Sequence, residues 1–119
     1  MEEKILVVSD TSSLRRIYEN KLSEHGFAID ISLDGKDALH KLQEELIDLV
    51  LLDLDIEHGS GLSYLQEFVA CRKKAKVVVV SDSSVYKNDF HSWAADAYLL
   101  KSTDLEELKN TIDAILHED

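Results

Sequence analysis

The sequence predicts an α/β fold, (βα)5, in which helices cover both faces of one doubly wound, five-stranded parallel sheet. Two observations lead to this prediction. Five short runs rich in β-branched residues alternate with segments in which apolar residues recur at helical spacing. Three of the runs are continuously apolar, as strands that are covered on both faces must be.

The elements can be assigned in order along the chain. The expected strands are KILVV, FAIDIS, DLVLLD, KVVVVS and AYLL, at residues 4–8, 27–32, 48–53, 76–81 and 97–100. The apolar stripes of the helices between and after them are Leu14, Ile17, Tyr18 and Leu22; Ala38, Leu39 and Leu42; Leu62, Leu65, Phe68 and Val69; and Leu105, Leu108, Ile112 and Ile115. Asp34 and Gly35 supply a turn, and the last helix begins after a hydroxyl or Asp cap in STDLEEL. The strand order expected for such a sheet is the flavodoxin-like 2-1-3-4-5.

Length and composition restrict the function classes. Residues 1–119 suit one domain with its own core, and Cys71, the single cysteine, excludes an internal disulfide. No stretch approaches the ~20 apolar residues of a membrane span, and the acidic start MEEK is unlike a signal peptide, so we expect a cytoplasmic protein without membrane contact. The net charge of −11 argues against direct binding to nucleic acid, which needs Lys and Arg at the phosphates.

Polar residues follow four of the five expected strands. Ser9 and Asp10 come after the first strand, Asp53 ends the third, Ser81 ends the fourth, and Lys101 follows the fifth. In open parallel sheets ligands bind beyond the carboxyl ends of the strands. The sequence therefore predicts one site that combines two acids, a hydroxyl and a lysine.

These residue types together suit phosphoryl transfer. A carboxylate such as Asp53 can act as nucleophile toward a phosphoryl donor and form an acyl phosphate. Such a transfer requires neutralisation of charge, which a Mg²⁺ ion and a cation can provide. Asp10 and Asp53 could supply carboxylates to Mg²⁺, Lys101 the cation, and Ser81 a donor to a phosphoryl oxygen.

The segments KILVVSD, GFAIDISLDGKDAL, DLVLLDLDIEHGSGL, KVVVVS and DAYLLKS, in this order, resemble the response-regulator receiver domains of two-component signalling. The resemblance implies that Asp53 accepts a phosphoryl group from a histidine kinase or a histidine phosphotransfer protein, and that the domain is a signalling module, not an enzyme. It also implies Mg²⁺ bound by Asp10, Asp53 and the backbone carbonyl of Asp55. Ser81 and Lys101 would contact the phosphoryl group, and Ser81 with Tyr98 would form the switch toward a downstream protein or effector domain.

The chain departs from the family pattern at several positions. Ser9 replaces the first of two adjacent acids, Ile56 and Glu57 stand where a Met-Pro pair is common, and Ser102 stands where proline usually follows the lysine. Asp82 follows Ser81 where a small residue is typical, so we expect an altered phosphate lifetime. We expect Ser9 to weaken Mg²⁺ binding without abolishing it, with Asp55 or Asp82 as sources of a replacement carboxylate. The segment from Ser81 to Lys101 is slightly short, so we expect the fourth helix, near residues 86–94, to be shortened or displaced.

Alternatives stay open at each point. Asp10 could cap the first helix, Ser81 and Lys101 could be a turn hydroxyl and a surface charge, and Tyr98 could be a packing residue. A degenerate receiver that binds partners without phosphate is the main alternative function, favoured by Ser9 and Asp82. A weaker one is a phosphatase, because LLDLDI resembles the D-x-D motif of haloacid-dehalogenase-like enzymes, with Asp55 as acid-base.

Overall fold

Five parallel strands form one sheet at the centre of the molecule. The structure is a computed structural model that describes residues 2–83 and 94–117, without the side chains of residues 58 and 59. The strand order is β2-β1-β3-β4-β5, as predicted, and all pairs are parallel. The strands are β1 (Lys4–Val8), β2 (Ala28–Ser32), β3 (Leu49–Asp53), β4 (Lys76–Ser81) and β5 (Ala97–Leu100). Only β2 and β3 differ from the predicted ranges, each by one residue at its start.

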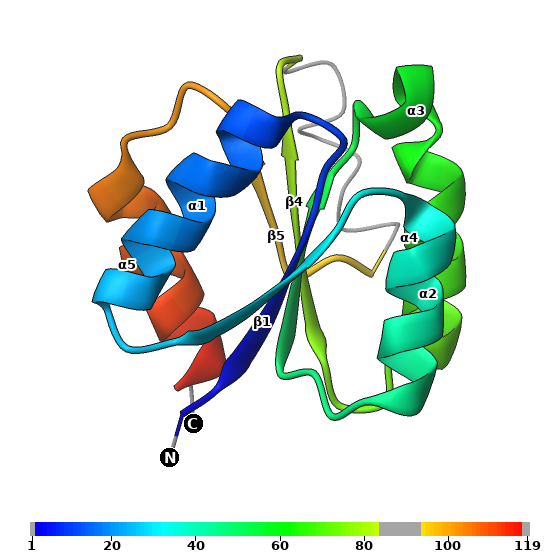
Figure 1. The fold of residues 1–119 in the computed structure, drawn as a ribbon, viewed down its shortest axis with the longest axis horizontal. Coiled ribbons are helices and arrows are strands. Elements are labelled where there is room, and N and C mark those ends of the chain that lie inside the picture. Colours follow the sequence, from blue (N-terminus) through cyan, green and yellow to red (C-terminus); the bar gives the residue numbers. More distant parts are fainter. Residues whose placement is uncertain (1, 84–93, 118–119) are drawn as a thin grey trace.

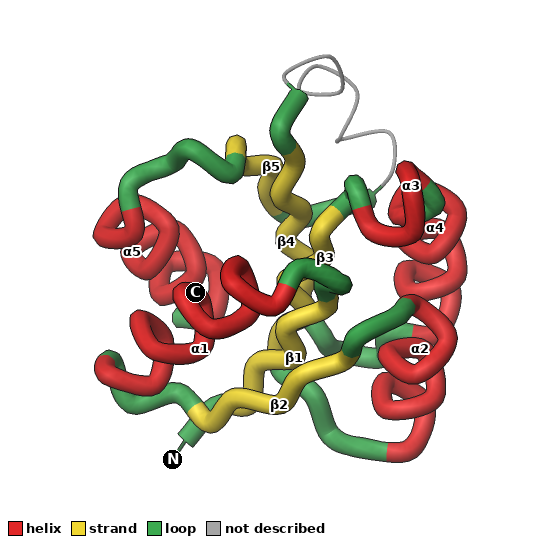
Figure 2. Tube along the Cα trace, turned by 45° about the horizontal axis from the view of Figure 1, so that its top comes forward, coloured by secondary structure: helices red, strands yellow, loops and turns green. Residues whose placement is uncertain are grey.

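Helices cover both faces of the sheet (Figures 1 and 2). They are α1 (Ser12–Glu24), α2 (Gly35–Glu44), α3 (Ile56–Gly59), α4 (Gly61–Cys71) and α5 (Leu105–Leu116). Helices α1 and α5 lie on one face, and α2 and α4 on the other (Figure 1). The cap predicted for the last helix is confirmed as Asp104, which accepts the N–H of Glu106 in the first turn of α5. Asp34, predicted to supply a turn, is also the N-cap of α2 and accepts the N–H of Asp37. The helix expected near 86–94 lies outside the described residues apart from Ala94, which is in a turn.

The side chains of the continuously apolar strands pack into two hydrophobic cores, one on each face of the sheet. Successive side chains of a strand point to opposite faces, so alternate residues of β1, β3 and β4 join different clusters. On the α2–α4 side they pack with Ala38, Leu65 and Phe68. On the α1–α5 side they pack with Leu22 and Ile112. This two-sided burial explains why these strands contain no alternating polar residues.

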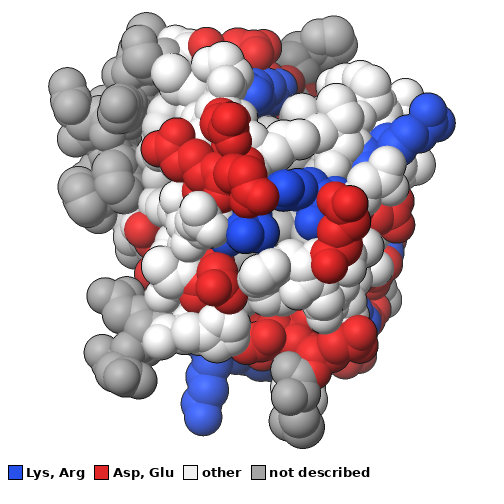
Figure 3. Space-filling model, turned by 90° about the vertical axis from the view of Figure 1, so that its left-hand side faces the viewer, with Lys and Arg blue, Asp and Glu red and all other residues white. Residues whose placement is uncertain are grey.

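The face formed by α1 and α5 carries charges of both signs. Lys21 of α1 pairs with Glu106 of α5 at 3.1 Å, and Lys109 pairs with the same carboxylate group at 3.2 Å. Figure 3 shows Lys and Arg side chains lying among Asp and Glu on this side of the molecule. The excess negative charge is therefore not gathered into one acidic patch here. None of the helices described by the structure is both long enough and apolar enough to cross a membrane.

Gly61 allows the start of α4 to approach the backbone of Leu54, which follows the end of β3. A Cβ atom added at Gly61 would lie 2.5 Å from both the Cα and the carbonyl oxygen of Leu54, the residue after Asp53. Backbone atoms cannot rotate away as a flexible side chain can, so any side chain at this position must push α4 off the end of β3.

We therefore expect Gly61→Ala to lower the free energy of unfolding by about 1–3 kcal/mol, as overpacking does in other cores. Ser63→Ala, at an exposed position of the same helix, is the control and should change it by less than about 0.5 kcal/mol. Urea unfolding of both variants measures the difference. Equal stability of the two variants would show that α4 can move away without cost.

Candidate functional site

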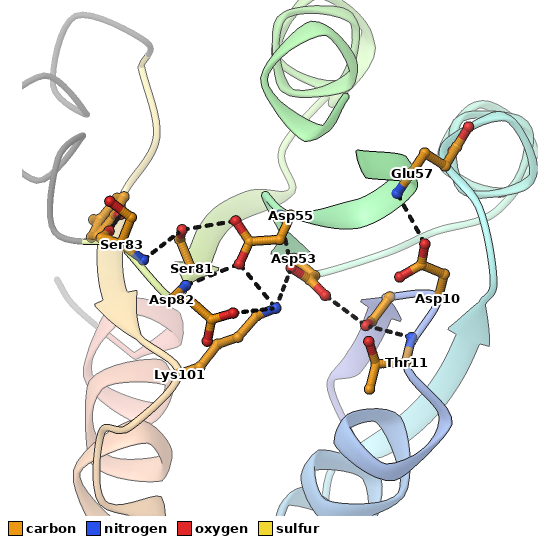
Figure 4. Close-up of polar contacts among 11 residues, drawn as sticks. Asp10, Thr11, Asp53, Asp55, Glu57, Ser81, Asp82, Ser83 and Lys101 are labelled. Carbon is orange, nitrogen blue, oxygen red and sulfur yellow. Dashed lines mark hydrogen bonds and ion pairs between the residues drawn. The ribbon is translucent and has the colours of Figure 1, made fainter. Parts of the chain in front are cut away.

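The carboxyl ends of the strands bring the predicted residues together at one edge of the sheet. The backbone ladder continues past the strands: the N–H of Ser9 donates to Ser32 at 3.1 Å, and that of Lys101 donates to the carbonyl of Ser81 at 2.9 Å. Figure 4 shows Asp53, Asp55, Ser81 and Lys101 pointing toward one another, with Asp10 on the far side of Asp53. The predicted convergence is therefore present in the structure.

The carboxylate of Asp53 is buried, and both of its oxygens accept hydrogen bonds. The residue is 2% exposed. Its Oδ1 lies 2.9 Å from the Lys101 ammonium and accepts the N–H of Asp55 at 2.9 Å, and its Oδ2 accepts the hydroxyl of Ser9 at 2.8 Å. A buried carboxylate is costly unless it is paired, and these three donors provide that compensation. Ser9 thus places a donor beside Asp53 at the position where the family usually has an acid.

The ammonium of Lys101 lies between carboxylates. Its Nζ is 2.9 Å from Asp53, 3.0 Å from Asp55 and 3.9 Å from Asp82. Burial alone would lower the pKa of this ammonium, but the hydrogen bonds to Asp53 and Asp55 outweigh burial and hold the pKa above its usual value. Lys101 therefore carries its charge at neutral pH, as a cation beside a phosphoryl group must.

The side chain of Asp55 faces the Lys101 side of the site. Its Oδ1 accepts the hydroxyl of Ser81 at 3.1 Å, and its Oδ2 accepts the N–H of Asp82 at 2.9 Å. Burial raises the pKa of Asp55, but the N–H of Asp82 and the Lys101 ammonium outweigh burial and hold the pKa below its usual value. The sequence analysis expected the backbone carbonyl of Asp55 to bind Mg²⁺ and named its carboxylate as a replacement ligand. It did not predict that this carboxylate would bridge Ser81 and Lys101.

Asp10 does not cap the first helix, so that alternative was wrong. The N-cap of α1 is Thr11, whose side chain makes no cap bond. The Oδ2 of Asp10, an exposed residue, instead accepts the N–H of Glu57 at 2.9 Å (Figure 4). Proline has no N–H, so this bond depends on the absence of the proline that the family commonly has at the position of Glu57.

Glu57 is a residue whose contacts the sequence analysis missed. Its backbone has φ 50°, a left-handed conformation that is uncommon outside glycine. Its carboxylate accepts the N–H of Gly35 at 3.1 Å and the hydroxyl of Tyr64 at 3.3 Å. Glu57 therefore connects α3 to the first residue of α2 and to the first turn of α4. The one signal in the sequence was the missing proline.

Tyr98 is a buried core residue in the strand that leads to Lys101. It packs in the cluster on the α2–α4 side of the sheet and is 7% exposed. Its hydroxyl donates to the carbonyl of Ser83, and the N–H of Ser83 donates to the hydroxyl oxygen of Ser81 at 3.1 Å. The packing role is therefore real. The switch role stays a prediction, and this chain of bonds joins Tyr98 to the site.

The carboxylate and carbonyl oxygens at this edge are of the chemical kind that Mg²⁺ binds. Within residues 2–83 and 94–117 no group of three or more His, Cys, Asp and Glu side chains is arranged to hold a metal ion. Mg²⁺ commonly uses one or two carboxylates and fills the remaining positions with water, carbonyl or phosphate oxygens. The carboxylates of Asp10 and Asp53, with the Asp55 carbonyl, are a set of that kind.

The ion pairs of Lys101 lead to a stability prediction. Lys101→Met should lower the free energy of unfolding by about 2–3 kcal/mol, because it leaves the buried Asp53 carboxylate without its cation. Adding Asp53→Asn should recover at least half of that loss, since the amide needs no cation. Lys109→Met is the control: its partner Glu106 is exposed and keeps water as a partner, so this change should cost less than about 0.5 kcal/mol. Denaturant unfolding of the four proteins tests this, and equal losses for the two lysines would contradict it.

Comparison with known proteins places the chain in a family. The family model of the response regulator receiver domain matches residues 5–113. The chain is 33% identical over 114 residues to the response regulator ArlR of Staphylococcus saprophyticus, covering 95% of this chain and 52% of that protein. The identity to ArlR of Staphylococcus aureus is 32% over the same length. The chain thus spans about half the length of the curated relatives that it matches.

Solved structures agree with this assignment. The response regulator TrrA of Thermotoga maritima, in complex with Mg²⁺–BeF, is 36% identical with a TM-score of 0.86, covering 95% of this chain and 98% of that one. A CheY-like receiver domain protein of Methanospirillum hungatei has the same fold, with a TM-score of 0.91 at 23% identity over 99% of this chain and 96% of that one. The site edge, the family model and these relatives agree: the chain belongs to the response regulator receiver domains of two-component systems.

Proposed function

We propose that residues 1–119 act as one receiver domain that accepts a phosphoryl group on Asp53 from the phosphohistidine of a histidine kinase or a histidine phosphotransfer protein. A carboxylate oxygen of Asp53 forms the new bond to phosphorus while the bond from phosphorus to the imidazole nitrogen breaks, and the imidazole keeps the electron pair. The observation that carries this proposal is the buried Asp53 carboxylate, 2.9 Å from the Lys101 ammonium at the carboxyl end of the central strand.

The neighbouring residues would hold the transferred group. Lys101 offsets negative charge on the phosphoryl oxygens, and the hydroxyl of Ser81 donates to one of them. Asp10, Asp53 and the carbonyl of Asp55 would hold Mg²⁺, which supplies further neutralisation when bound. Asp82 adds negative charge at the rim, 3.9 Å from Lys101, and would change the lifetime of the phosphate.

The output would pass through Ser81 and Tyr98 to a downstream protein or effector domain. The support is the run of hydrogen bonds from the Ser81 hydroxyl through Ser83 to the Tyr98 hydroxyl. We place the domain in the cytoplasm, where histidine kinases present their phosphohistidine, and without direct contact to nucleic acid or membrane. Beyond its own phosphorylation and dephosphorylation, we propose no enzymatic activity.

A receiver that binds partners without phosphate is the second candidate. It is favoured by Ser9, which contributes a neutral hydroxyl to Asp53 where an acid is usual. The phosphatase alternative needs Asp55 to donate a proton. Burial raises the pKa of Asp55, but the Asp82 N–H and Lys101 outweigh it and keep the pKa low, which does not support a proton donor.

The phosphoacceptor can be tested with beryllofluoride, which mimics a phosphoryl group on a carboxylate. In isothermal titration we expect saturable binding that requires Mg²⁺ and is lost in Asp53→Asn. A matched control is Asp48→Asn, just before the same strand, which should bind as the unaltered protein does. Intact-mass measurement after incubation with a small acyl phosphate should detect one added phosphoryl group. If the protein neither binds beryllofluoride nor gains a phosphoryl group, the receiver that binds partners without phosphate is favoured.

Ser9 leads to a prediction on metal affinity. Ser9→Asp should tighten Mg²⁺ binding by roughly five- to thirtyfold, because two unit charges about 4 Å apart attract each other by ~1 kcal/mol in a water-like medium, and the double charge of the ion raises this to ~2 kcal/mol. It should also destabilise the metal-free domain, since the new carboxylate lies beside buried Asp53. Ser9→Ala controls for loss of the hydroxyl. Unchanged Mg²⁺ affinity in Ser9→Asp, measured by titration calorimetry, would mean that Ser9 does not weaken the site.

A further inference from the structure

Three hydrogen-bond donors from two segments of the chain converge on one point of the site edge. They are the Ser81 hydroxyl at the end of β4, the backbone N–H of Asp82 and the ammonium of Lys101 after β5. All three donate to the carboxylate of Asp55, at 3.1, 2.9 and 3.0 Å (Figure 4). A hydroxyl, an amide and an ammonium that point at one place form an anion-binding arrangement. Its anion in this structure is a side chain of the protein.

This anion position lies directly beside the phosphoacceptor. Lys101 contacts both carboxylates, at 2.9 Å to Asp53 and 3.0 Å to Asp55, and the N–H of Asp55 donates to Asp53 Oδ1. A phosphoryl group bonded to Asp53 carries negative oxygens that need donors within this distance. The Lys101 ammonium, the Ser81 hydroxyl and the Asp82 N–H are donors at this place, and the Asp55 carboxylate already uses all three.

We propose that the Asp55 carboxylate is an internal occupant of the phosphoryl-binding donors and must leave them before a phosphoryl group can be held on Asp53. This inference rests on the proposed function and names a residue that limits it. The side chain can leave without unfolding, because it is 38% exposed and solvent can receive it. The backbone groups of Asp55 can stay in place when the side chain turns, so the N–H bond to Asp53 is not lost.

The other acid at the rim does not occupy these donors. The carboxylate of Asp82 is 79% exposed, and its nearer oxygen is 3.9 Å from Lys101, beyond hydrogen-bond distance. Only the backbone N–H of Asp82 takes part. Asp55 and Asp82 therefore place equal charges beside Lys101 with different contacts, and they form a matched pair for an experiment.

The expected effect follows from occupancy. When a binding site is free for only part of the time, the apparent Kd of its ligand equals the intrinsic Kd divided by the free fraction. If Asp55 holds the donors nine-tenths of the time, beryllofluoride binds about tenfold more weakly than it would to open donors. Asp55→Ala removes the occupant and keeps the backbone N–H and carbonyl. Asp55→Asn keeps the size of the side chain but loses its charge, so its Kd for beryllofluoride should fall between those of the unaltered protein and of Asp55→Ala.

The experiment measures the Kd of beryllofluoride, at saturating Mg²⁺, for the unaltered protein, Asp55→Ala, Asp55→Asn and Asp82→Ala. We expect Asp55→Ala to bind about tenfold or more tightly than the unaltered protein, and Asp82→Ala to gain less than threefold. In parallel, the amide proton of Asp82 should lose the downfield NMR shift typical of a carboxylate-bonded N–H in Asp55→Ala, and regain it when beryllofluoride binds.

The outcomes separate the two proposals. If the unaltered protein binds beryllofluoride and both Asp55 variants bind it no more tightly, the inference is overturned while the proposed function stands. Equal gains in Asp55→Ala and Asp82→Ala would also overturn it, because net charge and not occupancy would be the cause. If none of the proteins binds, the proposed function fails, and the inference fails with it. An unmoved Asp82 amide shift in Asp55→Ala would contradict the hydrogen bond itself, whatever the Kd values.

Discussion

Asp53 ends a strand in which every residue is buried, so its carboxylate has exchanged water for donors supplied by the protein. This exchange links distant parts of the chain. The hydroxyl comes from the end of β1, the ammonium from beyond β5, and the N–H from the loop that Asp53 itself begins. The order of the strands makes this possible, because β3 is central and its end lies between those of its neighbours. The rest of the site edge is arranged around one charge that cannot be left unpaired.

The polar groups of the site satisfy one another. Among the described residues, no buried side-chain nitrogen or oxygen lacks a hydrogen-bond partner. Ser9 contributes to this by donating to Asp53, where a second acid would repel it. Glu57 contributes through an N–H that a proline would not have, which engages Asp10. These two departures from the family pattern act in the same direction, since each adds a hydrogen bond within the site.

The sequence predicted the strands, their order and the convergence of Asp53, Ser81 and Lys101 well. Buried parallel strands have a strong apolar signal, and the geometry of such a sheet determines where their ends meet. The same reasoning could not predict the direction of the Asp55 carboxylate or the contacts of Glu57. These depend on local backbone dihedrals, such as the φ of 50° at Glu57, and on partners that include residues 22 to 47 positions away in the chain. The same reason explains the wrong interpretation of Asp10. Its position just before the first helix suggested a helix cap, but its hydrogen-bond partner is Glu57, 47 residues away in the chain.

The composition of β4 has a consequence for movement at this edge. Four consecutive valines, Val77–Val80, fill both cores and are at most 1% exposed. Branching at Cβ restricts their rotamers, and dense packing on both sides leaves no space into which they could turn. The strand is therefore a stiff support that ends at Ser81. Any displacement of the Ser81 hydroxyl must be absorbed by the chain that follows, toward Ser83 and the hydroxyl of Tyr98, because the sheet behind it cannot yield.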